Sequence, residues 1–287
     1  MLNLGEYRRR ADRLADHLPW AALVAPGVVL NKDGAFQRTF AFRGPDLESA
    51  TEAELVTAAA RVNNVLRRFG SGWALFFEAE RFEARGYPES RFPDAASWLV
   101  DKEREASFGG GRDHFESACH LTMVWLPPPD AQAGAERLFV EQSGEARGRD
   151  WRDALAAFVA ETDRAHDLLA GVLPEIAALD DAQTLAFLHA AVSGKRQAVA
   201  VPETPVYLDA VLADPPLTGG LEPVLGDTHL RTLTLLGFPG LSRPGILDAL
   251  NHLDFPYRWT SRFIALDKAE ATRALVRLRR QWFNKRK

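Results

Sequence analysis

The sequence predicts an α/β protein of the α+β kind, with helices packed on mixed β-sheets. First, apolar-rich runs of strand length alternate with segments whose apolar residues recur at helical spacing. Second, 46% of the residues are hydrophobic and 26% are charged, a balance that lets a chain bury a sizeable core. Third, 287 residues suffice for two ordinary domains. We therefore predict two mixed-sheet lobes, at residues 1–175 and 176–287.

The chain opens with a segment that we expect to form an amphipathic helix over residues 3–18, ahead of a β-hairpin. Its apolar residues Leu4, Tyr7 and Leu14 recur at helical spacing. Such a stripe packs on its own domain, docks on a partner or lies on lipid headgroups. For docking on a partner, the candidate contact residues are Leu4, Tyr7, Leu14 and Trp20.

Two apolar-rich runs, at residues 23–30 and 35–42, predict the hairpin. The four residues between them end in Asp33-Gly34, a step that supplies the positive φ of a tight turn. A capping box at Thr51 and Glu54 then begins a helix that ends before Gly70. The other elements expected in the first lobe are strand 73–79, helix 94–104, strand 121–126 and helix 150–173, whose apolar face includes Phe158 and Leu169.

The second lobe is predicted to begin with a helix at residues 181–192 that closes at Gly194. The following stretch, residues 201–226, is rich in proline and glycine and predicts connecting loops. We then expect strand 230–238, helix 244–253, strand 257–266 and helix 268–284. Asp267 and Glu270 stand where a helix N-terminus favours carboxylates. This final helix lacks a terminating glycine, and we expect a further domain to follow it.

Charge is distributed unevenly along the chain. Residues 268–287 hold eight basic residues and one acidic residue, although the whole chain has a net charge of −4. The body is therefore acidic and the final helix is basic. The candidate basic patch is Arg273, Arg277, Arg280 and Lys285. Such a patch either binds nucleic-acid phosphates or forms a solvated face that complements the helix dipole, and both alternatives stay open.

The expected compartment is the cytoplasm. A single cysteine, Cys119, excludes an intramolecular disulfide framework and a CxxC pair. The N-terminus lacks the apolar core of a secretory signal, and we find no run of about 18–20 uncharged apolar residues that would cross a bilayer. We therefore expect any membrane association to be peripheral or through a partner.

The sequence contains no complete catalytic or cofactor-binding motif, so we predict no catalytic and no cofactor-binding residues. The string nearest to a phosphate-binding loop ends in Gly194-Lys195-Arg196, and it lacks the first glycine and the hydroxyl residue after lysine. Gly194 is better explained as a helix terminator. Ser71 lies between two glycines, but the spacing is not that of the GxSxG nucleophile motif.

One group of potential metal ligands is dense enough to consider. His114, Glu116 and His120 share the parity that places alternate strand residues on one face. However, no second ligand pair of comparable quality occurs elsewhere in the chain. We therefore predict no metal site, and keep a metal-dependent enzyme as the weakest alternative.

Several strings together resemble a known family. They are residues 10–20 (RADRLADHLPW), 27–34 (GVVLNKDG), 69–78 (FGSGWALFFE) and 120–128 (HLTMVWLPP). In order and spacing they are similar to the N-terminal region of TrbE-type conjugal-transfer proteins, in the CagE/TrbE/VirB group of type IV secretion ATPases. The similarity covers nearly the whole chain.

This resemblance implies a function for the segment. In that family a front domain precedes a RecA-like ATPase motor at the cytoplasmic face of the bacterial inner membrane. The implied role is a non-catalytic docking module that contacts inner-membrane channel proteins and other copies of itself, with ATP and Mg²⁺ bound only by the motor. No position here matches an ATPase residue. DNA binding by the basic final helix is the alternative function.

Overall fold

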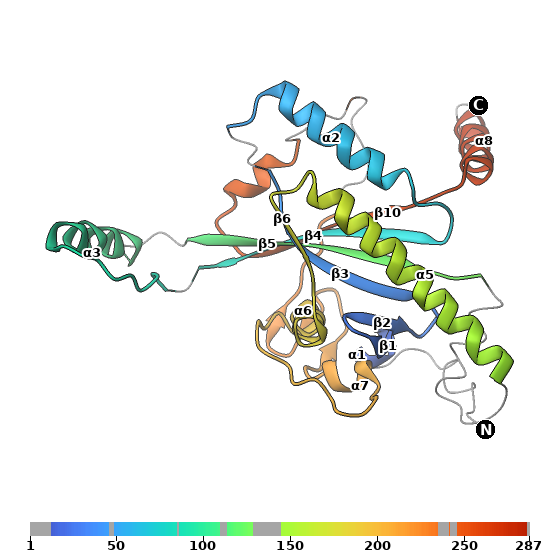
Figure 1. The fold of residues 1–287 in the computed structure, drawn as a ribbon, viewed down its shortest axis with the longest axis horizontal. Helices are drawn as coiled ribbons and strands as arrows, with labels where there is room; N and C mark the ends of the chain where they lie inside the picture. Colours follow the sequence, from blue (N-terminus) through green and yellow to red (C-terminus); the bar gives the residue numbers. More distant parts are fainter. Residues whose placement is uncertain are drawn as a thin grey trace.

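The structure is a computed structural model that describes residues 13–45, 49–84, 86–109, 114–128, 145–234, 241 and 246–285. Its centre is one antiparallel sheet of seven strands in the order β1-β2-β3-β5-β4-β10, with β6 also paired to β3 (Figure 1). These strands are β1 (Trp20–Ala25), β2 (Val28–Asn31), β3 (Phe36–Arg43), β4 (Trp73–Glu83), β5 (Phe115–Trp125), β6 (Glu175–Ala178) and β10 (Tyr257–Ile264). A smaller antiparallel sheet contains β7 (Leu217–Thr218), β8 (Val224–Leu225) and β9 (Thr228–His229).

The predicted fold class is confirmed, because helices pack on both faces of this sheet (Figure 1). On one face lie α2 (Glu52–Leu66) and α5 (Glu145–Ala170), and on the other lie α1 (Leu14–His17), α6 (Asp181–Ser193) and α7 (Leu208–Leu212). Two helices project from the body: α3 (Ala95–Gly109) stands at the tip of the β4–β5 hairpin, and α8 (Lys268–Lys285) follows β10. A short 3₁₀ helix, η3, spans Asp248–His252.

The prediction of mixed sheets is wrong, since every strand pair among the described residues is antiparallel. The main sheet also continues past the predicted boundary near residue 175. β6 pairs with residues 40–43 of β3, and β10 pairs with residues 74–81 of β4. Strands from the second segment therefore complete the sheet of the first.

Strand alternation divides the apolar core between the two faces of the sheet. Toward α2 and α5, Phe40, Leu121 and Met123 are fully buried and pack with Val65 of α2 and Leu169 of α5. Full burial of such side chains stabilises a fold by about 1.5–3 kcal/mol each. Toward α6 and α7, the core cluster contains Trp20, Val29, Leu185, Leu188, Leu208 and Leu212.

The predicted hairpin is confirmed in part. The end of the first predicted strand forms β2, and the second predicted strand forms β3. The turn between β2 and β3 has Gly34 at φ +84° and a hydrogen bond of 2.8 Å from Asn31 N to Ala35 O. The predicted strand 23–30 is wrong, because a turn at Pro26-Gly27 divides it into β1 and β2. Gly27 has φ +67°, a conformation that a side chain would strain.

The helix ends that capping residues predict are confirmed. Thr51 and Glu54 form the expected box at the start of α2, and Gly194 ends α6 in the left-handed region at φ +69°. In contrast, residues 230–234 of the predicted strand 230–238 form no strand, and the rest lies outside the described residues. The predicted helix 244–253 contains only η3 in its described part. β10 and α8 confirm the last two predictions.

Candidate functional site

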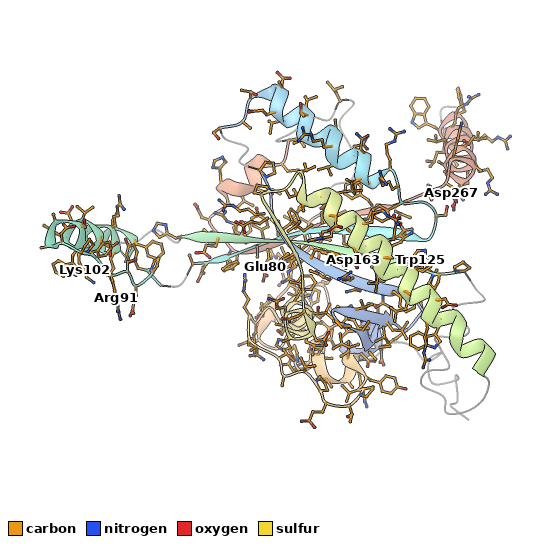
Figure 2. All side chains as sticks on the ribbon, viewed as in Figure 1. Glu80, Arg91, Lys102, Trp125, Asp163 and Asp267 are labelled. Carbon is orange, nitrogen blue, oxygen red and sulfur yellow. The ribbon has the colours of Figure 1, made fainter. Side chains whose placement is uncertain are left out.

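Charged side chains gather on the face of the sheet that carries α6. Glu78 and Glu80 point to this face from β4, and antiparallel pairing sets His120 of β5 opposite Glu78 and Arg258 of β10 opposite Glu80. We call Glu78, Glu80, His120, Arg196 and Arg258 the charged cluster. Figure 2 labels Glu80 in the middle of the molecule, where the strands cross above α6.

Arg258 lies near both glutamates of the charged cluster but binds only one of them closely. Its Nη2 lies 3.0 Å from Glu80 Oε1, whereas its Nη1 lies 3.6 Å from Glu78 Oε1, beyond hydrogen-bond distance. Both glutamate side chains are 13% exposed. Burial raises the pKa of Glu78, and the nearby Arg258 opposes that rise. The Glu80–Arg258 pair is therefore the firm contact of the cluster.

His120 is neutral at pH 7. Burial lowers its pKa to about 4, with Glu80 opposing the shift and Arg258 and Arg196 adding to it. Its ring packs against Phe187 of α6, with 4.5 Å between the ring centroids. Its buried Nδ1 has no hydrogen-bond partner. His120 thus contributes an uncharged aromatic surface between α6 and the sheet.

A cavity of about 370 Å³ opens beside these residues. Glu80 and His120 line it from the sheet, and Phe187 lines it from α6. Its remaining lining residues are Leu179, Gln183, Ala186, Ala190, Arg196, Gln197 and Ala198. The lining from α6 is thus largely apolar, and the sheet contributes a carboxylate.

Arg196 lies at the margin of this cavity, on the irregular segment that follows α6. Its guanidinium is 3.7 Å from the centroid of the Phe82 ring, and its Nη1 is 3.7 Å from Glu80 Oε2. The side chain is 45% exposed. The structure therefore supports the interpretation of Gly194 as a helix terminator: the turn at Gly194 carries Arg196 back over the sheet.

Ser193, His189 and Asp214 form a chain of polar contacts that the sequence did not suggest. Ser193 Oγ lies 3.2 Å from His189 Nδ1, and His189 Nε2 lies 3.2 Å from Asp214 Oδ1. The serine hydroxyl also donates to His189 O at 2.8 Å and accepts from Lys195 N at 3.1 Å. It sits at the C-terminal end of α6, where carbonyl groups disfavour an oxyanion. We interpret the chain as a link between α6 and the segment after α7.

The three potential metal ligands are separated in the structure. His114 stacks on Phe108 of α3 with 4.2 Å between centroids, and His120 contacts Phe187 from the middle of β5. Six residues of strand span roughly 20 Å, which is too far for shared coordination. Within the described ranges, no three His, Cys, Asp or Glu side chains are placed to hold a metal ion.

Ser71 connects the sheet to α8. Its hydroxyl donates to Glu270 Oε2 at 2.6 Å and accepts from Asp267 N at 3.0 Å. The Ser71 N–H lies 3.4 Å from Asp267 Oδ1. The carboxylates predicted at the start of the helix therefore bind a turn almost 200 residues earlier in the chain, and Figure 2 labels Asp267 at this junction.

The projecting helices expose apolar side chains. On α3, Trp98, Leu99 and Val100 are 51–59% exposed, and on α8 Leu275 and Leu278 are 66% and 56% exposed. Soluble proteins seldom expose such residues in groups unless the surface binds something. Among the residues that the structure describes, no helix is long and apolar enough to cross a membrane.

The predicted basic patch has the expected geometry. Arg273, Arg277 and Arg280 are exposed, and their spacing places them on one face of α8. Lys285 ends the helix, and its side chain lies outside the described residues. The patch thus exists as an accessible surface, and its ligand stays a prediction.

Of the four predicted partner contacts at the N-terminus, the structure describes Leu14 and Trp20. Leu4 and Tyr7 lie outside the described residues. Trp20 is only 9% exposed and belongs to the core cluster with Leu185 and Leu188, against which Leu14 also packs. For Trp20 the assignment as a surface contact is therefore wrong. An apolar stripe in a sequence looks the same whether its partner is another chain or α6.

The fold and the comparisons define the class of this protein. Residues 27–133 match the family described as "Type IV secretion system ATPase VirB4/TrbE, N-terminal domain". "Conjugal transfer protein TrbE" of Rhizobium radiobacter is 34% identical over 99% of this chain, and the first segment of the "Probable conjugal transfer protein TrbE" of Sinorhizobium fredii is 36% identical over 50% of it. The "Type IV secretion system protein virB4" of Brucella suis is 26% identical over 94% of the chain.

The chain belongs to the VirB4/TrbE family, and within it to the TrbE type. It spans 37% of the length of the Rhizobium radiobacter relative and 34% of the Brucella suis relative, but 99% of the Sinorhizobium fredii segment. The predicted resemblance is thereby confirmed.

Proposed function

We propose that this chain acts as a non-catalytic docking and assembly module of a type IV secretion ATPase. It couples a motor domain to inner-membrane channel components during conjugative transfer. The family membership supports the context, since relatives carry the names of conjugal transfer and type IV secretion proteins. ATP and Mg²⁺ are assigned to the motor of the longer relatives and not to this segment. The proposed location is the cytoplasmic face of the bacterial inner membrane.

The exposed apolar side chains on the projecting helices carry this proposal. α3 is held at the end of the β4–β5 hairpin by a hydrogen bond of 2.7 Å from the Tyr87 hydroxyl to Asp101 Oδ1. This contact orients the helix while Leu99 and Val100 remain more than half exposed. A helix that is fixed on an arm and exposes apolar side chains is suited to binding another protein.

Site-specific photocrosslinking tests the proposal. A photoreactive amino acid would replace Leu99 on α3 or Leu278 on α8 in cells that assemble the secretion system. We expect crosslinks from at least one position to inner-membrane channel proteins or to a second copy of the chain. Leu221, which is fully exposed between β7 and β8, is the matched control. If neither helix gives more product than Leu221, the docking role is refuted.

DNA binding is the second candidate function, and the exposed arginine face of α8 favours it. Arg273, Arg277 and Arg280 would contact phosphates and release counterions. Titration of labelled single- and double-stranded DNA at several salt concentrations distinguishes the functions. A steep fall in affinity with salt, lost in the triple alanine variant, supports DNA binding, and a weak response that is equal in both proteins excludes it.

A further inference from the structure

We propose that the cavity between Glu80 and Phe187 binds the cationic side chain of an arginine or lysine in a basic segment of a partner protein. The inference rests on the proposed docking function, and it names a binding site for that function. The site lies on the body of the protein, apart from the projecting helices. It would give the module a charge-specific contact in addition to apolar ones.

Glu80 supplies the group that recognises a cation. Its Oε1 binds Arg258 at 3.0 Å, which holds the side chain in place. Its Oε2 is 3.7 Å from the Arg196 guanidinium, too far for a hydrogen bond. The Glu80 side chain is 13% exposed, and a carboxylate oxygen without a close donor is suited to a charge-assisted hydrogen bond. The cavity opens beside this carboxylate.

The remaining lining of the cavity fits the stem and the flat face of such a side chain. Phe187 and His120 present adjoining aromatic rings, and a cation over an aromatic ring is attracted to its face. Leu179, Ala186 and Ala190 add apolar surface that can cover a methylene stem. Because His120 is uncharged at neutral pH, it does not repel the ligand.

Arg196 shows how this surface holds a guanidinium. It already combines an aromatic face, Phe82 at 3.7 Å, with the Glu80 carboxylate. Its side chain is 45% exposed and extends from a segment without regular structure. An incoming arginine could therefore replace Arg196 at Glu80 without changing the number of charges in the cluster. Arg196 acts as an internal competitor for the site.

Charge also indicates the kind of partner. The chain has a net charge of −4 although its last 20 residues are strongly basic, so its body is acidic. Inner-membrane proteins keep lysine and arginine in their short cytoplasmic segments. Such segments are attracted to an acidic body, and one of their cations would enter the cavity.

A peptide titration tests the proposal on the full chain. The probe is a short glycine-serine peptide with one arginine, and the matched peptide has citrulline, which keeps the shape without the charge. Binding is followed by NMR through the backbone signals of Ala186 and Ala198. We expect the arginine peptide to shift these signals and the citrulline peptide to bind at least about ten-fold more weakly. Equal binding of the two peptides would overturn the proposal.

Three variants locate the site. E80Q and A186F remove the carboxylate and fill the cavity respectively, and each should weaken binding by about ten-fold. R196A should strengthen binding several-fold, because it removes the competitor. E103Q, which removes an exposed carboxylate on α3, is the control and should bind like the unchanged chain. If E80Q and A186F both bind normally, the cavity is not the site, whereas the crosslinks from α3 and α8 can still succeed.

Discussion

The Ser71 hydroxyl donates a 2.6 Å hydrogen bond to Glu270, a residue 199 positions later in the chain. This contact joins the turn before β4 to the first turn of α8. A Cβ at Gly70 would lie 2.6 Å from Asp267 Oδ1, so a larger residue there would displace this carboxylate. The direction of α8 is therefore set at its N-terminal end by a close approach of two chain segments, while its apolar side chains stay exposed.

Replacing Ser71 with alanine tests this anchor. The change removes the donor to Glu270 and the acceptor for Asp267 N. We expect a loss of about 1 kcal/mol in the free energy of unfolding, because both bonds are solvent-exposed. Hydrogen exchange of the first turn of α8 should rise, and exchange of α5 should not. Unchanged protection of α8 would show that other contacts hold the helix.

Gly27 provides a sharper test of backbone geometry. It has φ +67°, and a Cβ would lie 2.2 Å from the Leu179 carbonyl oxygen. Its N–H also donates to Asp181 Oδ1 at 2.6 Å, which ties the β1–β2 turn to α6. We expect G27A to destabilise the fold by about 2–3 kcal/mol in denaturant unfolding. G44A, whose new Cβ meets nothing within 4 Å, is the control and should have little effect.

Phe158 of α5 is the central ring of an aromatic cluster between this helix and the sheet. It is fully buried, and its centroid lies 5.7 Å from that of Phe36, 5.6 Å from that of Trp73 and 6.5 Å from that of Trp125. We expect F158A to lower the free energy of unfolding by about 3–5 kcal/mol, since it leaves a cavity in the core. The near-ultraviolet circular dichroism of the tryptophans should change with it. F255A, at a half-exposed ring, should leave both measurements nearly unchanged.

Local signals predicted the elements of this fold better than their pairing. Thr51, Gly194 and the Asp33-Gly34 turn each act within a few residues, and each was interpreted correctly. The pairing of β10 with β4 depends on contacts across nearly two thirds of the chain, and the residues of neither strand indicate which strand it pairs with. The division into two lobes with separate sheets failed to anticipate this pairing.

The candidate site was harder to predict than the fold. Glu78, Glu80 and Arg258 form ordinary alternating strand patterns, and only the register places them on one face. The spacing of His120 from His114 suggests a shared ligand set, but the two side chains have different surroundings. Trp20 is a candidate contact in the sequence because it follows an apolar stripe near the N-terminus, but α6 covers it. A sequence identifies such residue types without identifying what they face.

The lowered pKa of His120 predicts a pH dependence of stability. Its folded pKa is about 4, below the ordinary value of 6.5, so the unfolded chain binds more protons between these values. Stability should therefore rise with pH through this window and be lost as pH falls, by about 2 kcal/mol at pH 5. The raised pKa of Glu78 acts in the opposite sense above pH 4.5.

The variant H120F isolates this contribution, because phenylalanine retains the packing on Phe187 and cannot take up a proton. Urea unfolding at pH 5 and pH 7 should show a smaller difference in the free energy of unfolding for H120F than for the unchanged chain. An equal difference in the two proteins would mean that His120 is not the group responsible.

Substitutions of Leu278 and Leu188 compare an exposed residue of the proposed docking surface with a residue of the core. Leu278 is 56% exposed on α8, whereas Leu188 is 1% exposed on α6. We expect L278Q to change the free energy of unfolding by no more than about 0.5 kcal/mol, because glutamine suits a helix and little apolar surface is lost. L188Q should cost about 3 kcal/mol or more, since it buries an amide without a partner. These two values are checked by denaturant titration.

The L278Q variant also tests whether the exposed apolar side chains of α8 bind a partner. If α8 binds a partner, L278Q should reduce capture of inner-membrane components from assembled complexes although the domain stays folded. A side chain whose loss leaves both stability and capture unchanged would have neither role. Reduced stability of L278Q would instead show that Leu278 packs within its own chain in solution, and the apolar stripe of α8 would then belong to the core.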